Sequence, residues 1–98
     1  MLILDRNWRP HSSEVVGEVD LIARDGDALV IVEVKTRRAL AFGAPVEAVT
    51  RRKIRQLRSL ALAWLDERSI HAPALRFDVV AVTIPPAGQP VVEHLRVV

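Results

Sequence analysis

The sequence predicts a single α/β domain built on a mixed sheet, and three observations support this fold class. The chain has 98 residues, half of them hydrophobic, which is the size and composition of one compact domain. Two runs rich in Val, Ile and Leu are separated by an Asp-Gly pair, which is typical of an antiparallel hairpin. A later segment repeats apolar residues every three or four positions, which is typical of an amphipathic helix.

The first half of the chain is expected to supply strands. Residues 2–8 are short and apolar enough for a strand, and Pro10 ends it. Residues 18–24 and 28–35 are the two strands of the central hairpin. Residues 39–45 contain Gly and Pro, so we expect an irregular connection there.

A long helix is expected over residues 51–68, with Thr50 as its N-cap. Its apolar side chains form one stripe that should lie buried on the sheet, namely Ile54, Leu57, Leu60, Ala61, Trp64 and Leu65. After Pro73, residues 76–84 are almost continuously apolar, which predicts a central strand. A last strand is expected over residues 91–97.

Composition excludes several classes of protein. The absence of cysteine excludes a disulfide scaffold, a zinc–thiolate site and a thiol nucleophile. No apolar run approaches the roughly 18 residues that span a bilayer, so we expect no membrane association and a cytoplasmic location. The net charge is only +2, but the charges are segregated: residues 14–33 carry six acids and one base, whereas residues 35–58 carry eight bases and one acid.

The hairpin is expected to bring several acidic residues of segment 14–33 close together. A hairpin that turns at the Asp-Gly pair would place Glu18 directly opposite Glu33. Asp20 and Glu33 would then be diagonal neighbours, with about 7–8 Å between their Cα atoms. Because strand residues alternate between faces, we expect Glu18, Asp20, Glu33 and Lys35 to project to one side of the sheet.

Crowded carboxylates of this kind repel one another, and a divalent cation such as Mg²⁺ or Mn²⁺ would relieve the repulsion. We therefore expect Asp20 and Glu33 to be metal ligands, with Glu18 as an auxiliary acid. Lys35 would orient a nucleophile or neutralise charge that develops on a phosphate; the alternative is a simple exposed ion pair with Glu33. Lys53, at the edge of the helix stripe, either reaches the acidic face or covers the helix flank.

Three segments carry a family resemblance: GEVDLIARDGDALVIVEVKTRR, then FGAPVEAVT with Lys53, then RFDVVAV. Through them the chain resembles the YraN family of uncharacterised bacterial proteins over nearly its whole length. That family is similar to restriction-endonuclease-like nucleases and Holliday-junction resolvases, whose PD-(D/E)xK signature is matched by Asp20, Glu33 and Lys35. The resemblance implies a restriction-endonuclease-like fold. It also implies an N-terminal helix with a glutamate, so residues 1–98 are expected to be one domain truncated relative to the family.

The leading functional hypothesis is therefore a Mg²⁺- or Mn²⁺-dependent endonuclease that hydrolyses DNA, with branched or structured DNA among its expected substrates. Basic residues would hold the phosphates, namely Arg37, Arg38, Arg51, Arg52, Arg55 and Arg58. Two alternatives stay open: a non-catalytic nucleic-acid-binding module on the same scaffold, and a small subunit whose charged faces dock another protein. Whether the chain is an enzyme is therefore left open at this level.

The remaining residues carry weaker expectations. The three histidines show no ligand spacing and receive no role, and Trp8 is expected to pack rather than stack on a base. Asp78, inside an apolar strand, should be structural and needs a partner such as Arg76. Because one helix covers only one face of a sheet, we expect a homodimer that buries the apolar N-terminal residues 2–4.

Overall fold

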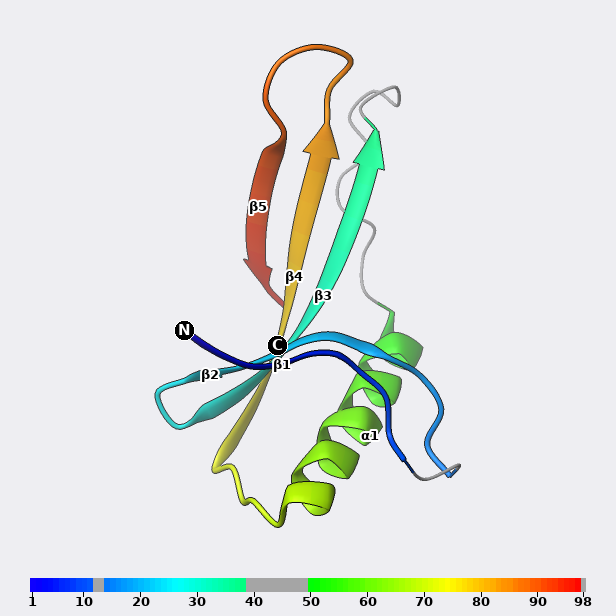
Figure 1. Ribbon diagram of the computed structural model, residues 1–98, viewed down its shortest axis with the longest axis vertical. Coiled ribbons are helices and arrows are strands. Elements are labelled where there is room, and N and C mark those ends of the chain that lie inside the picture. Colours follow the sequence, from blue (N-terminus) through cyan, green and yellow to red (C-terminus); the bar gives the residue numbers. More distant parts are fainter. Residues whose placement is uncertain (12–13, 39–49, 98) are drawn as a thin grey trace.

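A computed structural model describes residues 1–11, 14–38 and 50–97, and Figure 1 shows their arrangement. The strands are β1 (Leu2–Trp8), β2 (Val19–Asp25), β3 (Ala28–Arg38), β4 (Ala74–Ile84) and β5 (Val91–Arg96), and the helix is α1 (Arg51–Arg68). The strands form one sheet in the order β1-β2-β3-β4-β5. The expected mixed α/β fold is thus confirmed, whereas the predicted irregular segment 39–45 lies outside the described residues.

The sheet is antiparallel except at its centre, where β3 and β4 run parallel along their whole length. A parallel pair needs a crossover connection, and α1 lies within this one. The apolar segment that becomes β4 is flanked by β3 and β5, which confirms its expected internal position. No helix in the described part of the chain is long and apolar enough to cross a membrane.

The hairpin forms with a register two residues away from the predicted one. Asp25 pairs with Ala28, so the turn residues are Gly26 and Asp27 instead of the Asp-Gly pair. Gly26 has φ +59° and stands at the first central position, which is where a two-residue turn of type II′ requires glycine. A shift of two residues keeps every side chain on its predicted face, so the expectation for the faces of β2 and β3 survives the error in register.

Helix α1 begins and ends where the sequence predicts. The side chain of Thr50 accepts a hydrogen bond from the Lys53 amide at 3.1 Å, and this satisfies one otherwise unpaired donor of the first turn. Ser69 ends the helix with φ +52°, in the left-handed region. The apolar stripe packs on one face of the sheet, where the buried helix residues are Leu57, Leu60, Ala61, Trp64 and Leu65.

This packing forms the larger of two hydrophobic clusters. Its centre on the sheet side is Ile22 and Ile31, both fully buried beneath α1, with Phe77 beside them. Trp8 also packs into the cluster, as expected. On the opposite face of the sheet, a smaller cluster of buried residues consists of Ala23, Val30 and Val32.

Candidate functional site

Asp20 lies at the start of β2, at a point where the ladder between β2 and β3 stops. The last paired residues there are Leu21 and Val32. Beyond them, Oδ2 of Asp20 accepts a hydrogen bond from the backbone N–H of Val34 at 2.8 Å. The carboxylate therefore takes the place of a backbone acceptor and is held against β3 by the main chain rather than by a flexible partner.

Glu33 lies on the neighbouring strand, on the side covered by α1. Ile31 packs beneath the helix, and alternation along β3 puts Glu33 and Lys35 on the same side as Ile31. The Glu33 side chain is 18% exposed, and its Oε2 is buried and accepts no hydrogen bond within the described part of the chain. Lys53 supplies an ion pair at 3.3 Å between Nζ and this oxygen, in a geometry that is not a hydrogen bond.

Lys35 is half-buried and two residues beyond Glu33 on β3. Within residues 1–11, 14–38 and 50–97 it makes no ion pair, so the ion pair between Lys35 and Glu33 that was considered as an alternative does not form there. Lys53 takes that place instead, which resolves the choice left open for Lys53 in favour of the acidic face. Asp20 on β2 and Glu33 and Lys35 on β3 therefore lie along one stretch of the sheet, and Lys53 reaches Glu33 from the first turn of α1.

Glu18 is not part of this arrangement. It precedes β2, and its Oε2 accepts from Arg9 Nε at 2.9 Å and lies 2.7 Å from Arg9 Nη2. The expected cross-strand opposition of Glu18 and Glu33 is wrong, because the observed register is shifted by two residues and would place Asp20, rather than Glu18, opposite Glu33. The ladder itself ends one pair earlier, at Leu21 and Val32. Within the described ranges, no group of three or more His, Asp or Glu residues is placed to hold a metal ion.

Two carboxylates nevertheless match the requirements of one class of metal. Mg²⁺ in proteins commonly uses one or two carboxylates and completes its shell with water and substrate phosphate oxygens. Asp20 has one oxygen anchored to the main chain, and Glu33 has a buried oxygen that lacks a hydrogen bond. The donor set therefore fits a Mg²⁺- or Mn²⁺-type ion bound together with a phosphate, and it does not fit a closed site made of protein ligands alone.

The basic residues of α1 lie on its exposed side. Four arginines there are exposed, namely Arg51, Arg52, Arg55 and Arg58, and no acidic residue lies in the first turn. The positive end of the helix dipole adds to their charge. At the end of β3, Arg37 and Arg38 are exposed as well. Of the cationic residues of α1, Lys53 is the one that contacts the carboxylates in the described part of the chain, through Glu33.

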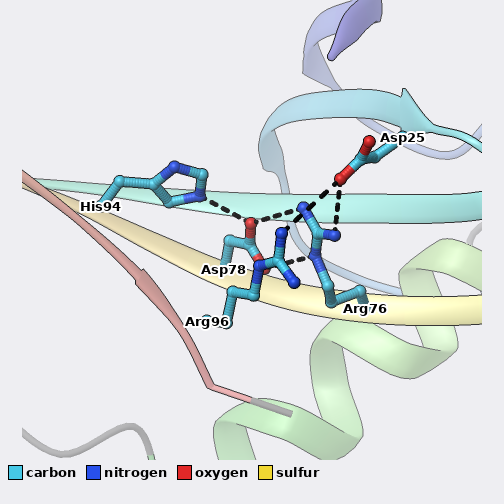
Figure 2. Close-up of polar contacts among 5 residues, drawn as sticks. All are labelled: Asp25, Arg76, Asp78, His94 and Arg96. Carbon is cyan, nitrogen blue, oxygen red and sulfur yellow. Dashed lines mark hydrogen bonds and ion pairs between the residues drawn. The ribbon is translucent and has the colours of Figure 1, made fainter.

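The opposite face of the sheet carries a second polar cluster, which Figure 2 shows. Asp78 on β4 has a fully buried side chain that accepts from Arg76 Nε at 3.0 Å and Arg76 Nη2 at 3.1 Å. His94 Nε2 on β5 is hydrogen-bonded to Asp78 Oδ2 at 2.6 Å. The expected structural role of Asp78 with Arg76 is confirmed in these contacts, whereas the contact of His94 was missed.

The same cluster reaches the hairpin turn. Arg76 Nη1 donates to Asp25 Oδ2 at 2.8 Å, and Arg96 Nη2 lies 3.9 Å from the same oxygen. The hydrogen bond from Arg76, and then its charge, hold the pKa of the Asp25 carboxyl below its ordinary value of 3.8. The cluster thereby links β2, β4 and β5. Only the pairing of β4 with β5, which the sequence does not display, brings His94 to Asp78.

A pocket of about 410 Å³ lies away from the candidate site, at the other end of α1. Its walls include Leu4, Leu29, Trp64 and Ile70, with Arg24 among its polar residues. None of the candidate metal or phosphate residues lines it. The pocket is therefore not part of the candidate metal and phosphate site.

Comparison with known proteins places the chain in a family. The sequence profile described as "Uncharacterised protein family UPF0102" matches residues 1–82. A UPF0102 protein of Rhodococcus opacus (strain B4) is 56% identical over 96 residues, which cover 98% of this chain and 78% of the relative. A UPF0102 protein of Beutenbergia cavernae is 56% identical over 94 residues (96% of this chain, 76% of the relative), and one of Arthrobacter sp. (strain FB24) is 55% identical over 96 residues (98% and 78%). The chain belongs to the uncharacterised protein family UPF0102.

Proposed function

We propose that this chain is a divalent-metal-dependent nuclease that hydrolyses phosphodiester bonds in DNA, including branched or structured DNA. One observation carries the proposal: adjacent strands present a carboxylate anchored by a backbone amide and a buried carboxylate oxygen that lacks a hydrogen bond, beside two lysines. A purely structural sheet does not need a buried carboxylate oxygen that lacks a hydrogen bond, because the ion pair with Lys53 offsets only part of its desolvation. The resemblance of Asp20, Glu33 and Lys35 to the PD-(D/E)xK signature supports the same assignment.

In this proposal Asp20 and Glu33 hold Mg²⁺ or Mn²⁺. When bound, such a cation polarises the phosphate and makes a water molecule more acidic. Hydrolysis would form a bond from a water oxygen to phosphorus and break the bond from phosphorus to the leaving sugar oxygen, and a proton given up by the water would balance the charge on the leaving oxygen. Lys35, with no ion pair among the described residues, neutralises negative charge that develops on the phosphate oxygens.

The substrate is held by charge rather than by base contacts. Arg51, Arg52 and Arg55 extend the cationic surface from the candidate site along α1, and Arg37 and Arg38 extend it along β3. Arginine and lysine contacts to phosphate oxygens give binding that is insensitive to sequence. Such contacts suit a nuclease that recognises the shape of DNA.

The metal site is tested by comparing two aspartates. Asp20→Asn removes a proposed ligand, whereas Asp27→Asn changes a residue of the hairpin turn. We expect Asp20→Asn to weaken Mn²⁺ binding at least about tenfold and Asp27→Asn to leave it near the wild-type value, as measured by isothermal titration calorimetry. Plasmid and four-way-junction cleavage with and without Mn²⁺ tests turnover. Equal metal affinities for the two variants would remove the basis of the proposal.

A second candidate function is a nucleic-acid-binding module without turnover. It is favoured by the contact of Lys53 with Glu33, which already supplies a positive charge to the carboxylate that a metal would use. The two candidates differ in one result. DNA binding that persists without Mn²⁺-dependent cleavage, in a chain whose Asp20→Asn variant behaves as wild type, would favour the binding module.

A further inference from the structure

The side chain of Lys53 stands between α1 and the proposed metal ligand. Its backbone N–H is held by the Thr50 cap, so the first turn of the helix is fixed. Its Nζ reaches across to Glu33 Oε2 at 3.3 Å, and the lysine side chain is 37% exposed. The ammonium group therefore contacts the proposed metal ligand, while the partly exposed side chain leaves it able to move toward solvent.

Glu33 depends on this lysine for its charge balance. Its Oε2 is buried and has no hydrogen bond among the described residues, which leaves Lys53 as the cation that offsets the cost of burying it. Lys35 is on the same face of β3 but makes no ion pair with Glu33 in the described part of the chain. Lys53, rather than the lysine of the signature, is therefore the counterion.

We propose that a divalent cation and Lys53 compete for Glu33, and that the displaced ammonium then binds a phosphate oxygen of the DNA. This inference rests on the proposed metal site. Lysine is suited to the exchange, because its charge is a single ammonium on a flexible stem that can move without disturbing the helix. Arg52 is the preceding residue and is exposed, so the released ammonium joins an existing cationic surface.

The exchange couples the two ligands. Metal binding frees Lys53 for phosphate, and phosphate binding to Lys53 frees Glu33 for metal, so each ligand must strengthen the binding of the other by the same factor. In a variant without the Lys53 ammonium, Glu33 has no competing cation, so phosphate binding no longer strengthens metal binding through this exchange. Lys53 is thus a positioning residue that links substrate binding to assembly of the metal site.

The test uses Lys53→Met with Arg52→Met as its matched control. Both variants lose one positive charge from the first turn of α1, but only Lys53 contacts Glu33. Calorimetric titration without DNA should show Mn²⁺ binding about three- to tenfold tighter in Lys53→Met than in wild type, with a smaller change in Arg52→Met. Lys53→Gln repeats the measurement with a polar side chain, should the methionine variant fail to fold.

Fluorescence anisotropy of labelled duplex DNA provides the second readout. In wild type, Mn²⁺ should strengthen DNA binding by a larger factor than in Lys53→Met, because the released ammonium contributes only in wild type. Equal Mn²⁺ affinities for Lys53→Met and Arg52→Met, in a protein whose binding still depends on Asp20, would overturn the exchange and leave the metal site standing. Absence of Asp20-dependent binding in wild type and in Lys53→Met would overturn both.

Discussion

At the scale of single residues, the buried carboxylate of Asp78 most needs compensating partners, because its side chain is fully buried. Arg76 and His94 share it, and Arg76 also holds Asp25 at the hairpin turn. Removing one partner of a buried ion pair leaves the other charge uncompensated, which costs far more than an exposed pair contributes. The carbon stem and guanidinium of Arg76, 15% exposed, lie over the face of the sheet that α1 does not cover. Charged side chains thus form part of the surface of this face.

The contact of Arg76 with Asp25 should make the stability of the fold depend on pH, and the lowered pKa of Asp25 gives the sign of this dependence. Because the folded protein has a lowered pKa at Asp25, this carboxyl stabilises the fold at pH values above 3.8 and loses that contribution as the pH falls below it. Between about pH 5 and pH 2, the unfolding free energy measured by urea unfolding should therefore fall less in Asp25→Asn than in wild type, because asparagine has no carboxyl group to protonate.

Glu67, whose pKa is lowered by hydrogen bonds from His11, is present in both proteins, so the difference between them isolates Asp25. Parallel curves for wild type and variant across the acid range would show that the contact with Arg76 contributes nothing to folding.

At the scale of elements, α1 combines two roles on opposite sides. Its buried side forms the core with β2 and β3, whereas its exposed side carries the arginines. The division follows directly from the 3.6-residue period, because residues three and four apart share a side. Lys53 lies at the boundary between the two sides, which is why it reaches Glu33 while the neighbouring arginines face solvent.

The exposed side of α1 is predicted to contact DNA phosphates. Replacing Arg51, Arg55 and Arg58 with Gln should reduce the magnitude of the salt dependence, because each phosphate contact contributes about −0.9 to the slope of log affinity against log salt concentration. Arg6→Gln, on the exposed surface of β1, should leave the slope unchanged. Anisotropy titrations at several salt concentrations measure both slopes, and an unaltered slope in the triple variant would mean that this helix side is only solvated.

At the scale of the whole molecule, β1 and β5 are the edge strands of the sheet, and no further strand of the described residues pairs with either. Leu2, Ile3 and Leu4 are 61%, 45% and 40% exposed on β1, and Val92 is 62% exposed on β5. The face opposite α1, by contrast, buries Val30 fully within the chain. The apolar surface that motivates the expected homodimer therefore lies at the edges of the sheet, where unpaired backbone groups also invite a further strand.

The homodimer stays a prediction. Sedimentation at micromolar concentration should report about twice the chain mass of 10.9 kDa, and Ile3→Lys should shift the population toward monomer by placing a charge on the β1 edge. A monomer in wild type, together with no binding of a dye for exposed apolar surface, would contradict it.

The sequence alone determined the strands, the helix with its cap at Thr50, the buried stripe, and the shared face of Glu33 and Lys35, because each depends on residues close together in the chain. The register of the hairpin was mispredicted although its cause is local, because the turn places Gly26 at the position that needs a positive φ. Tertiary structure decided the contacts between elements. It also decided that Glu18 pairs with Arg9, that Lys53 reaches Glu33, and that His94 reaches Asp78. These contacts join separate segments of the chain, and their partners are set by strand order and by where the helix packs, which no local pattern contains.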